Sequence, residues 1–232
     1  MKPVCILQHD YCNTPAYFGD FLSSSGVPWQ LLRLDLGDSV PCDLSAFSGL
    51  CFMGGMMSVN DEAEFRFLID ELRLIREAHA AGLPVIECTA WCATHQQGAG
   101  WSCSQNHVPE VGWHTARSPS QAQQSRVARC NALDDEVTLF QWHEETFSLP
   151  AGTALLLQGN HCHEVRPSSS AIASVTKRIE VTPQVVQFWA GARHGELNLP
   201  SESVQSAATI LDIEGKIASL RWSLTACTGI GC

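Results

Sequence analysis

The first half of the sequence alternates short apolar runs with amphipathic stretches, and this alternation constrains the fold more than any other feature. Apolar runs at residues 4–7, 29–34, 49–53 and 85–86 are typical of buried strands. Strands that alternate with helices predict a parallel sheet covered by helices on both faces. We therefore expect an α/β fold with a central, mostly parallel sheet.

Two helices are predicted between these strands from the spacing of their apolar residues. The first follows residue 16 and ends at Gly26. The second has an apolar face over residues 65–75, with Asp61 and Glu64 spaced as in a capping box before it. Gly82 is a stop signal at its end.

The second half of the chain has a different pattern. Residues 101–179 read as short strands and loops, which predicts a small antiparallel appendage. Residues 183–192 and 204–224 are predicted to form helices. Because the sequence contains neither an internal repeat nor a linker, we expect residues 1–232 to form a single domain.

Composition excludes several functions. The chain of 232 residues has a formal charge of -10, so we expect no general affinity for nucleic acid or an anionic membrane, both of which need a positive field. It contains neither a membrane-length apolar window nor a signal peptide pattern. Its 11 cysteines lack regular spacing, which favours reduced thiols and a cytoplasmic location.

Candidate ligand sites follow two of the predicted strands. Ligands of parallel α/β sheets bind at the carboxyl ends of the strands, and Gly54 and Gly55 lie at such an end. The stretch PVIECTAWCATHQ, residues 84–96, has the outline of a strand, a tight turn and a helix. In α/β enzymes such a turn often carries a nucleophile between small residues.

Short motifs run nearly end to end in a recognisable order: Leu7-Gln-His9, Arg33-Leu-Asp35, Met53-Gly-Gly-Met-Met-Ser-Val-Asn-Asp61, Glu110-Val-Gly-Trp113, Trp142-His-Glu-Glu-Thr-Phe147, Glu180-Val-Thr-Pro183 and Val204-Gln-Ser-Ala207. In these motifs the chain resembles the class I glutamine amidotransferases, in particular stand-alone members similar to the amidotransferase domain of GMP synthase. The resemblance implies a flavodoxin-like three-layer sandwich and a Cys-His-Glu triad that cleaves the side-chain amide of glutamine through a thioester.

The sequence departs from the family pattern at the catalytic positions. Aligned without gaps, the family's nucleophile falls on Thr89, and the glycines beside it become Glu87 and Trp91. The triad histidine falls on Arg178, whereas the glutamate is kept as Glu180.

Four interpretations of the nucleophile stay open. Thr89 could attack, although an unaided hydroxyl is a poor nucleophile. Cys88 could attack if the turn slips by one residue. Cys92 could attack because residues 92–96 echo the family's Cys-x-Gly-His-Gln motif. The fourth interpretation is that none of them attacks and that both cysteines are packed thiols.

The missing triad histidine requires another proton acceptor. Arg178 stays protonated and cannot act as a base, although its fixed charge can favour a nearby thiolate. His95, His143 and His163 are possible substitutes, and spacing does not choose among them. The segment 194–196, His-Gly-Glu, imitates the family's His-Pro-Glu but lies beyond it, so we discount it.

Other residues are candidates for binding. Gly54 and Gly55 can offer backbone N–H groups to an oxyanion. The resemblance places His143, Glu144 and Glu145 where the family contacts the ammonium group of the amino acid, and Trp91 and Arg178 near the substrate. These assignments predict a small-molecule γ-glutamyl compound as ligand.

We expect neither a cofactor nor a metal. His161 and His163 alternate as on one strand face, and His107 and His114 lie elsewhere, but a second spaced ligand pair typical of zinc is absent from the sequence.

Two hypotheses follow for the function. The first is a hydrolase of a γ-glutamyl amide that uses a displaced cysteine. The second is a catalytically inactive relative that binds a ligand or a partner protein. A synthetase or pathway partner and a homo-oligomer are compatible with both.

Overall fold

The computed structural model of the chain describes residues 1–58, 60–87, 103–117, 136–147, 153–161, 163–167, 172–174, 178, 180–198, 200–218 and 220. Its central sheet has five strands in the order β2-β1-β3-β4-β9, and every neighbouring pair is parallel. These strands are β1 (Val4–Gln8), β2 (Trp29–Arg33), β3 (Gly49–Phe52), β4 (Val85–Glu87) and β9 (Ile172–Ser174). The expected parallel sheet is confirmed.

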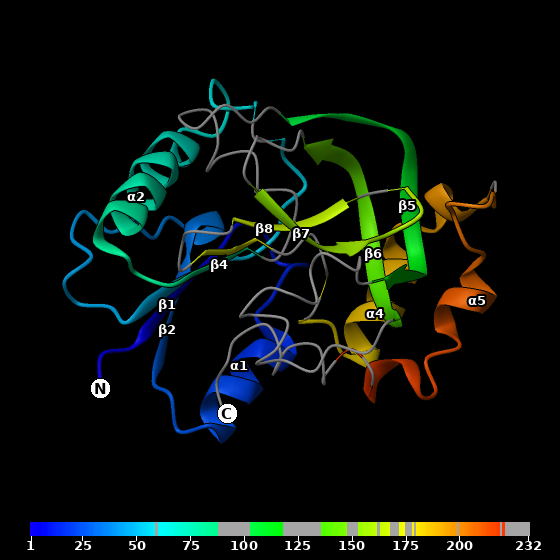
Figure 1. Cartoon of the computed structure of the whole chain (residues 1–232), viewed down its shortest axis with the longest axis horizontal. Helices are drawn as coiled ribbons and strands as arrows, with labels where there is room; N and C mark the ends of the chain where they lie inside the picture. The colour runs from blue at the N-terminus through cyan, green and yellow to red at the C-terminus, as the bar shows by residue number, and fades with distance from the viewer. Residues whose placement is uncertain are drawn as a thin grey trace.

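Alternation of side chains along β1 and β3 separates two core layers. Cys5 and Leu7 of β1 face the cluster that includes Leu74 and Ile75 of α2 (Phe67–Ala81). Ile6 faces the opposite cluster, which contains residues of α1 (Ala16–Ser24) and α4 (Pro183–Ala192). Figure 1 shows α2 and α1 on opposite sides of the sheet. The chain is therefore a three-layer α/β sandwich, as expected.

Helix α2 begins later than the capping-box pattern predicts. The carboxylate of Asp61 accepts the backbone N–H of Ser58 at 2.7 Å, and its carbonyl accepts the N–H groups of Glu64 and Phe65. These bonds close a local turn, so the side chain of Asp61 does not cap the helix, which begins at Phe67. The predicted end is confirmed, because Gly82 takes the left-handed conformation with φ 65°.

A second, antiparallel sheet has the order β6-β5-β7-β8. Its strands are β5 (Cys103–Arg117), β6 (Glu136–Phe147), β7 (Thr153–Gln158) and β8 (His163–Pro167). The appendage is present, but the expectation of short strands throughout it is wrong, because β5 and β6 span 15 and 12 residues and pair with each other. Strand β9 also leaves the appendage and joins the parallel sheet beside β4.

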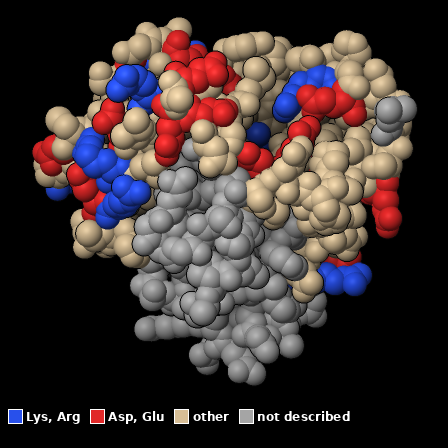
Figure 2. All heavy atoms as spheres, turned by 90° about the horizontal axis from the view of Figure 1, so that it is seen from above, with Lys and Arg blue, Asp and Glu red and all other residues tan. Residues whose placement is uncertain are grey.

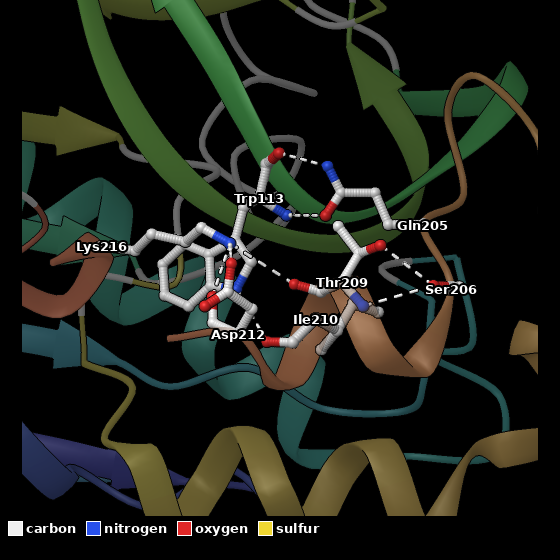
Figure 3. A network of polar contacts seen from close by, with 7 residues as sticks. All are labelled: Trp113, Gln205, Ser206, Thr209, Ile210, Asp212 and Lys216. Atoms are coloured by element: carbon white, nitrogen blue, oxygen red, sulfur yellow. Dashed lines mark hydrogen bonds and ion pairs between the residues drawn. The ribbon is translucent and has the colours of Figure 1, made fainter. Parts of the chain in front are cut away.

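The helix predicted over residues 204–224 is interrupted. Val204 forms an isolated parallel bridge with Val111 of β5, and helix α5 (Ala207–Leu211) begins only at a Ser206 cap. The side chain of Gln205 bonds both the N–H and the carbonyl of Trp113 (Figure 3). The helix 183–192 has the predicted bounds, with Thr182 as its N-cap.

Only glycine fits at position 112 of β5, where residues 204–205 pack against this strand. Gly112 has φ 118°, a conformation that side chains rarely adopt, and a Cβ there would collide with the side chain of Gln205. The indole N–H of Trp113 donates to the carbonyl of Ile210 at 2.9 Å, which fixes the next turn (Figure 3). Within the described ranges, no helix combines the length and apolar character needed to cross a bilayer.

Candidate functional site

The segment that follows β3 borders a cavity of about 330 Å³. Gly55 contributes backbone to the cavity wall, and Gly54 is buried behind it. This position at the carboxyl end of a central strand is where α/β sheets bind ligands. The cavity is lined by Gly55, Met56, Met57, Ser58, Asp61, Val111, Trp142, His143, Glu144, Glu145, Arg178, Arg193 and Glu196.

A buried ion pair supports the glycine segment from behind. His9, directly after β1, lies 2.7 Å from Glu71 of α2, and both side chains are fully buried. Burial disfavours the charged ring, but the charge and hydrogen bond of Glu71 outweigh it and raise the pKa of His9, aided by backbone groups of Gly54 and Met53. The pair thus joins β1, α2 and the candidate oxyanion segment.

Carboxylates line one end of the cavity. Ser58 donates its hydroxyl to Glu145 at 2.7 Å, and this bond joins the segment after β3 to strand β6. Asp61 and Glu144 line the same cavity. Acidic side chains also lie along the hollow on the face shown in Figure 2. This end of the cavity is suited to an ammonium group.

His143 is held by contacts to both of its ring nitrogens. Nδ1 lies 3.0 Å from the backbone carbonyl of Glu145, and a carbonyl only accepts, so Nδ1 carries a proton. Nε2 lies 3.2 Å from the buried carboxylate of Glu110. The ring therefore holds the backbone of Glu145, and because Nε2 faces the carboxylate of Glu110, this geometry does not favour His143 as the substitute base.

Glu110 also faces a second histidine away from the cavity. His114 lies 4.0 Å from the other carboxylate oxygen, and burial lowers the pKa of His114 although Glu110 opposes this. The rings of His114 and His161 meet edge to face, with centroids 6.1 Å apart. Within the described ranges, no group of three or more His, Cys, Asp or Glu side chains is arranged to hold a metal ion.

Arg178 takes the position where the resemblance expects a histidine. Its guanidinium bonds Asn13 at 2.5 Å, lies 3.6 Å from Glu180 and stacks 4.7 Å above the ring of Trp189. The side chain is almost completely buried and lines the cavity. A permanent positive charge is therefore fixed at the cavity wall.

Glu180 lies beneath Arg178 and is 1% exposed. Burial raises the pKa of Glu180 to about 7, because the cost of burying the carboxylate exceeds the attraction of Arg178. Neither carboxylate oxygen has a hydrogen bond within the described part of the chain. Near neutral pH this group can therefore exchange a proton.

Arg193 and Glu196 are among the cavity residues that were not predicted as site residues. Glu196 accepts the indole N–H of Trp142 at 2.7 Å and Nε of Arg193 at 2.8 Å. Together these residues form one wall of the cavity. His194 is exposed and bonds Gly191, so the segment 194–196 contributes its glutamate but not an imidazole. For Arg193 the sequence offered one signal, namely that this residue directly follows the predicted helix 183–192.

A second cavity of about 120 Å³ adjoins the first. It is lined by Tyr11, Cys12, Asn13, Gly55, Met56, Arg178, Phe188, Trp189, Ala192 and Arg193.

Several predicted residues lie outside the residues that the structure describes. These are Cys88, Thr89, Trp91, Cys92 and His95. The backbone of His163 begins β8, but its side chain is not described. Their roles stay predictions.

Solved structures resemble the chain over nearly its whole length. A glutamine amidotransferase from Methylobacillus flagellatus shares 32% sequence identity, with a TM-score of 0.87 over 98% of this chain and 92% of that one. A glutamine amidotransferase from Thermotoga maritima shares 20% identity, with a TM-score of 0.83 over 97% and 96%.

A protein from Thermoplasma acidophilum that is described as a GMP synthase subunit shares 17% identity, with a TM-score of 0.60 over 78% of this chain and 86% of that one. A scan against protein-family models found no match, and a search of curated proteins found none.

Proposed function

The chain belongs to the glutamine amidotransferase family, and from this premise we propose that it hydrolyses the amide bond of a γ-glutamyl compound. The observation that carries the proposal is the charge arrangement of the main cavity. Carboxylates of Glu145 and Asp61 lie at one end, and the buried cation Arg178 lies in the wall with Gly55. A γ-glutamyl group presents an ammonium group at one end and a polar amide at the other, which suits this arrangement.

The proposed reaction has two steps. A cysteine thiolate of the segment 88–92 attacks the amide carbon, and the oxyanion accepts N–H groups of Gly54 and Gly55. The C–N bond breaks, and the amine leaves after it takes up a proton. Water then attacks the thioester, which releases glutamate and restores the thiol.

Two described side chains support this chemistry. The fixed charge of Arg178 favours a thiolate beside it. Glu180, with a pKa of about 7, can give or take a proton near neutral pH. The direct donor to the leaving amine remains a prediction, and His95 and His163 are the remaining candidates from the sequence.

A second candidate function is binding of the same compound without turnover. The observation that favours it is again Arg178, which replaces the expected proton acceptor with a group that stays protonated. Its contacts with Asn13 and Glu180 hold it in place.

Release of glutamate tests the proposal. The protein is incubated with glutamine and with several γ-glutamyl amides, and glutamate is measured for the parent, Cys88→Ala and Cys92→Ala. We expect at least a 100-fold loss in one of the two variants, because removal of a nucleophile abolishes the covalent step. Cys42→Ala is the control, since Cys42 is an exposed free thiol.

Unchanged rates in both variants would refute a displaced cysteine. Failure to release glutamate from any amide, together with thermal stabilisation by the same compounds, would establish the binding function instead.

A further inference from the structure

The second cavity meets the main cavity at the point where the scissile amide would lie. The two cavities share Gly55, Met56, Arg178 and Arg193. This set contains a candidate oxyanion residue and the residue in the position of the triad histidine. A γ-glutamyl amide whose ammonium group lies at Glu145 would therefore point its amine portion into the second cavity.

Three aromatic side chains, Tyr11, Phe188 and Trp189, line one side of the second cavity. Tyr11 and Phe188 meet edge to face with centroids 6.0 Å apart, and both are strongly exposed, at 69% and 45%. Trp189 and Ala192 complete this side. Exposed aromatic rings beside a cavity provide apolar surface that a ligand can cover.

The charged lining residues of the second cavity are arginines. Arg178 and Arg193 are the only charged side chains among its described lining residues. Each is paired with a carboxylate, Glu180 at 3.6 Å and Glu196 at 2.8 Å. Because both arginines are already paired with carboxylates, the cavity offers little electrostatic attraction to a charged amine portion of either sign.

We propose that this cavity is a subsite for the amine portion of the substrate, and that it selects an uncharged aryl or branched alkyl group. The inference rests on the proposed γ-glutamyl function. Its volume of about 120 Å³ suits one small ring, since an apolar cavity of about 150 Å³ in a protein holds benzene.

Binding constants of three γ-glutamyl amides test the subsite. Calorimetry on the Cys88→Ala/Cys92→Ala double variant, which avoids turnover, compares glutamine, γ-glutamyl benzylamide and γ-glutamyl 4-aminobutylamide. We expect the benzylamide to bind at least tenfold more tightly than glutamine, because its ring covers apolar surface. The aminobutylamide should bind no more tightly than glutamine.

A cavity-filling variant gives the matched comparison. Ala192→Leu places a larger side chain in the subsite, so the affinity ratio of benzylamide to glutamine should fall at least fivefold. Gln187→Leu, at an exposed position of the same helix outside both cavities, should keep the ratio of the parent.

Equal affinities for glutamine and the benzylamide, or a ratio that Ala192→Leu leaves unchanged, would overturn the subsite. This result is separate from the test of hydrolysis, because binding is measured without turnover. A protein that prefers the benzylamide but releases no glutamate in the parent form would retain the subsite and lose the proposed reaction.

Discussion

At the scale of single residues, Arg178 and Glu180 define what the site can do. An imidazole at position 178 would exchange a proton near neutral pH, whereas a guanidinium does not. The group that can exchange a proton here is the buried carboxylate of Glu180, whose pKa is raised to about 7. With arginine at position 178, the titratable member of the pair is therefore Glu180, which lies beneath the cavity wall, and not the residue in the wall itself.

The raised pKa of Glu180 predicts a pH-dependent stability. In the folded chain this carboxyl keeps its proton to about pH 7, whereas its ordinary pKa is 4.5. Its stabilising contribution is therefore present below pH 4.5 and is lost as the pH rises to about 7. This difference corresponds to about 3 kcal/mol in the free energy of unfolding.

Urea unfolding of Glu180→Gln at pH 5 and pH 8 measures this contribution. The variant should lack the part of the pH dependence that Glu180 supplies. The difference in unfolding free energy between parent and variant should therefore decrease by about 2 to 3 kcal/mol between pH 5 and pH 8, since a small part of the loss already occurs below pH 5. The same difference at both pH values would show that Glu180 titrates normally.

At the scale of elements, the pair of His9 and Glu71 connects the end of β1 to the second turn of α2. The two residues are 62 positions apart in sequence. The pair lies directly behind Gly54 and Gly55, and a Cβ at Gly55 would contact Met57 and His9. The candidate oxyanion segment is therefore packed against an ion pair rather than against apolar side chains alone.

Glu71→Gln should destabilise the protein by about 3 kcal/mol near pH 6, because removal of one partner leaves a buried imidazole without its counter-charge. The raised pKa of His9 means that the pair contributes below pH 6.5 and loses its contribution as the pH rises through the folded pKa. The loss in the variant should therefore be smaller at pH 9.

Chemical denaturation at both pH values checks this prediction. Glu77→Gln on the same helix is the control, because its ion pair with Arg73 is exposed and follows i,i+4 spacing. The control should lose less than about 0.5 kcal/mol. Equal losses in the two variants would argue against a special role for the buried pair.

Helices whose ends are marked by nearby residues could be predicted from the sequence. Elements that depend on contacts with residues far away in the sequence could not. Helix α4 (Pro183–Ala192) has a Thr182 cap and a proline in its first turn, so its bounds were predicted correctly. The bridge between Val204 and Val111 depends on a strand far away in sequence. No helical periodicity signals such a bridge, so the prediction of one continuous helix over 204–224 was wrong at its start, although residues 207–211 are helical and residues 221–224 lie outside the described part of the chain.

In the candidate site, residues marked by sequence motifs were predicted, and residues whose roles depend on contacts across the fold were missed. The family motifs pointed to Gly55, Glu145 and Arg178, and all three line one cavity. Arg193 and Glu196 were missed because their roles arise from contacts with Trp142 across the fold. Asp61 was read as part of a capping box, but its carboxylate bonds the backbone of Ser58 instead.

At the scale of the whole molecule, the main cavity is built from both sheets. Gly55 follows β3 of the parallel sheet, whereas Trp142 to Glu145 belong to β6 of the antiparallel sheet. The hydrogen bond from Ser58 to Glu145 crosses between them at 2.7 Å. A ligand in this cavity touches both sheets and should stabilise them together.

A γ-glutamyl ligand at 100 times its dissociation constant should raise the free energy of unfolding by about 2.7 kcal/mol. Glu145→Gln should weaken binding at least tenfold, because it removes a carboxylate from the ammonium end. Thermal unfolding with glutamine or the benzylamide measures both effects.

Glu136→Gln, at an exposed position of the same strand, should keep the ligand response of the parent. An identical ligand response in Glu145→Gln and the parent would place the ammonium group elsewhere.

The pairing of residues 203–205 with β5 has a consequence for synthesis of the chain. Val111 donates its N–H to Ser203 and accepts from Gln205, and Gly112 leaves room for the amide of Gln205. A ribosome completes β5 long before it reaches position 205, so the backbone N–H and carbonyl of Val111 lack these protein partners until then. During that interval water can satisfy these groups, and this wall of the cavity is complete only after residues 203–205 have been synthesised.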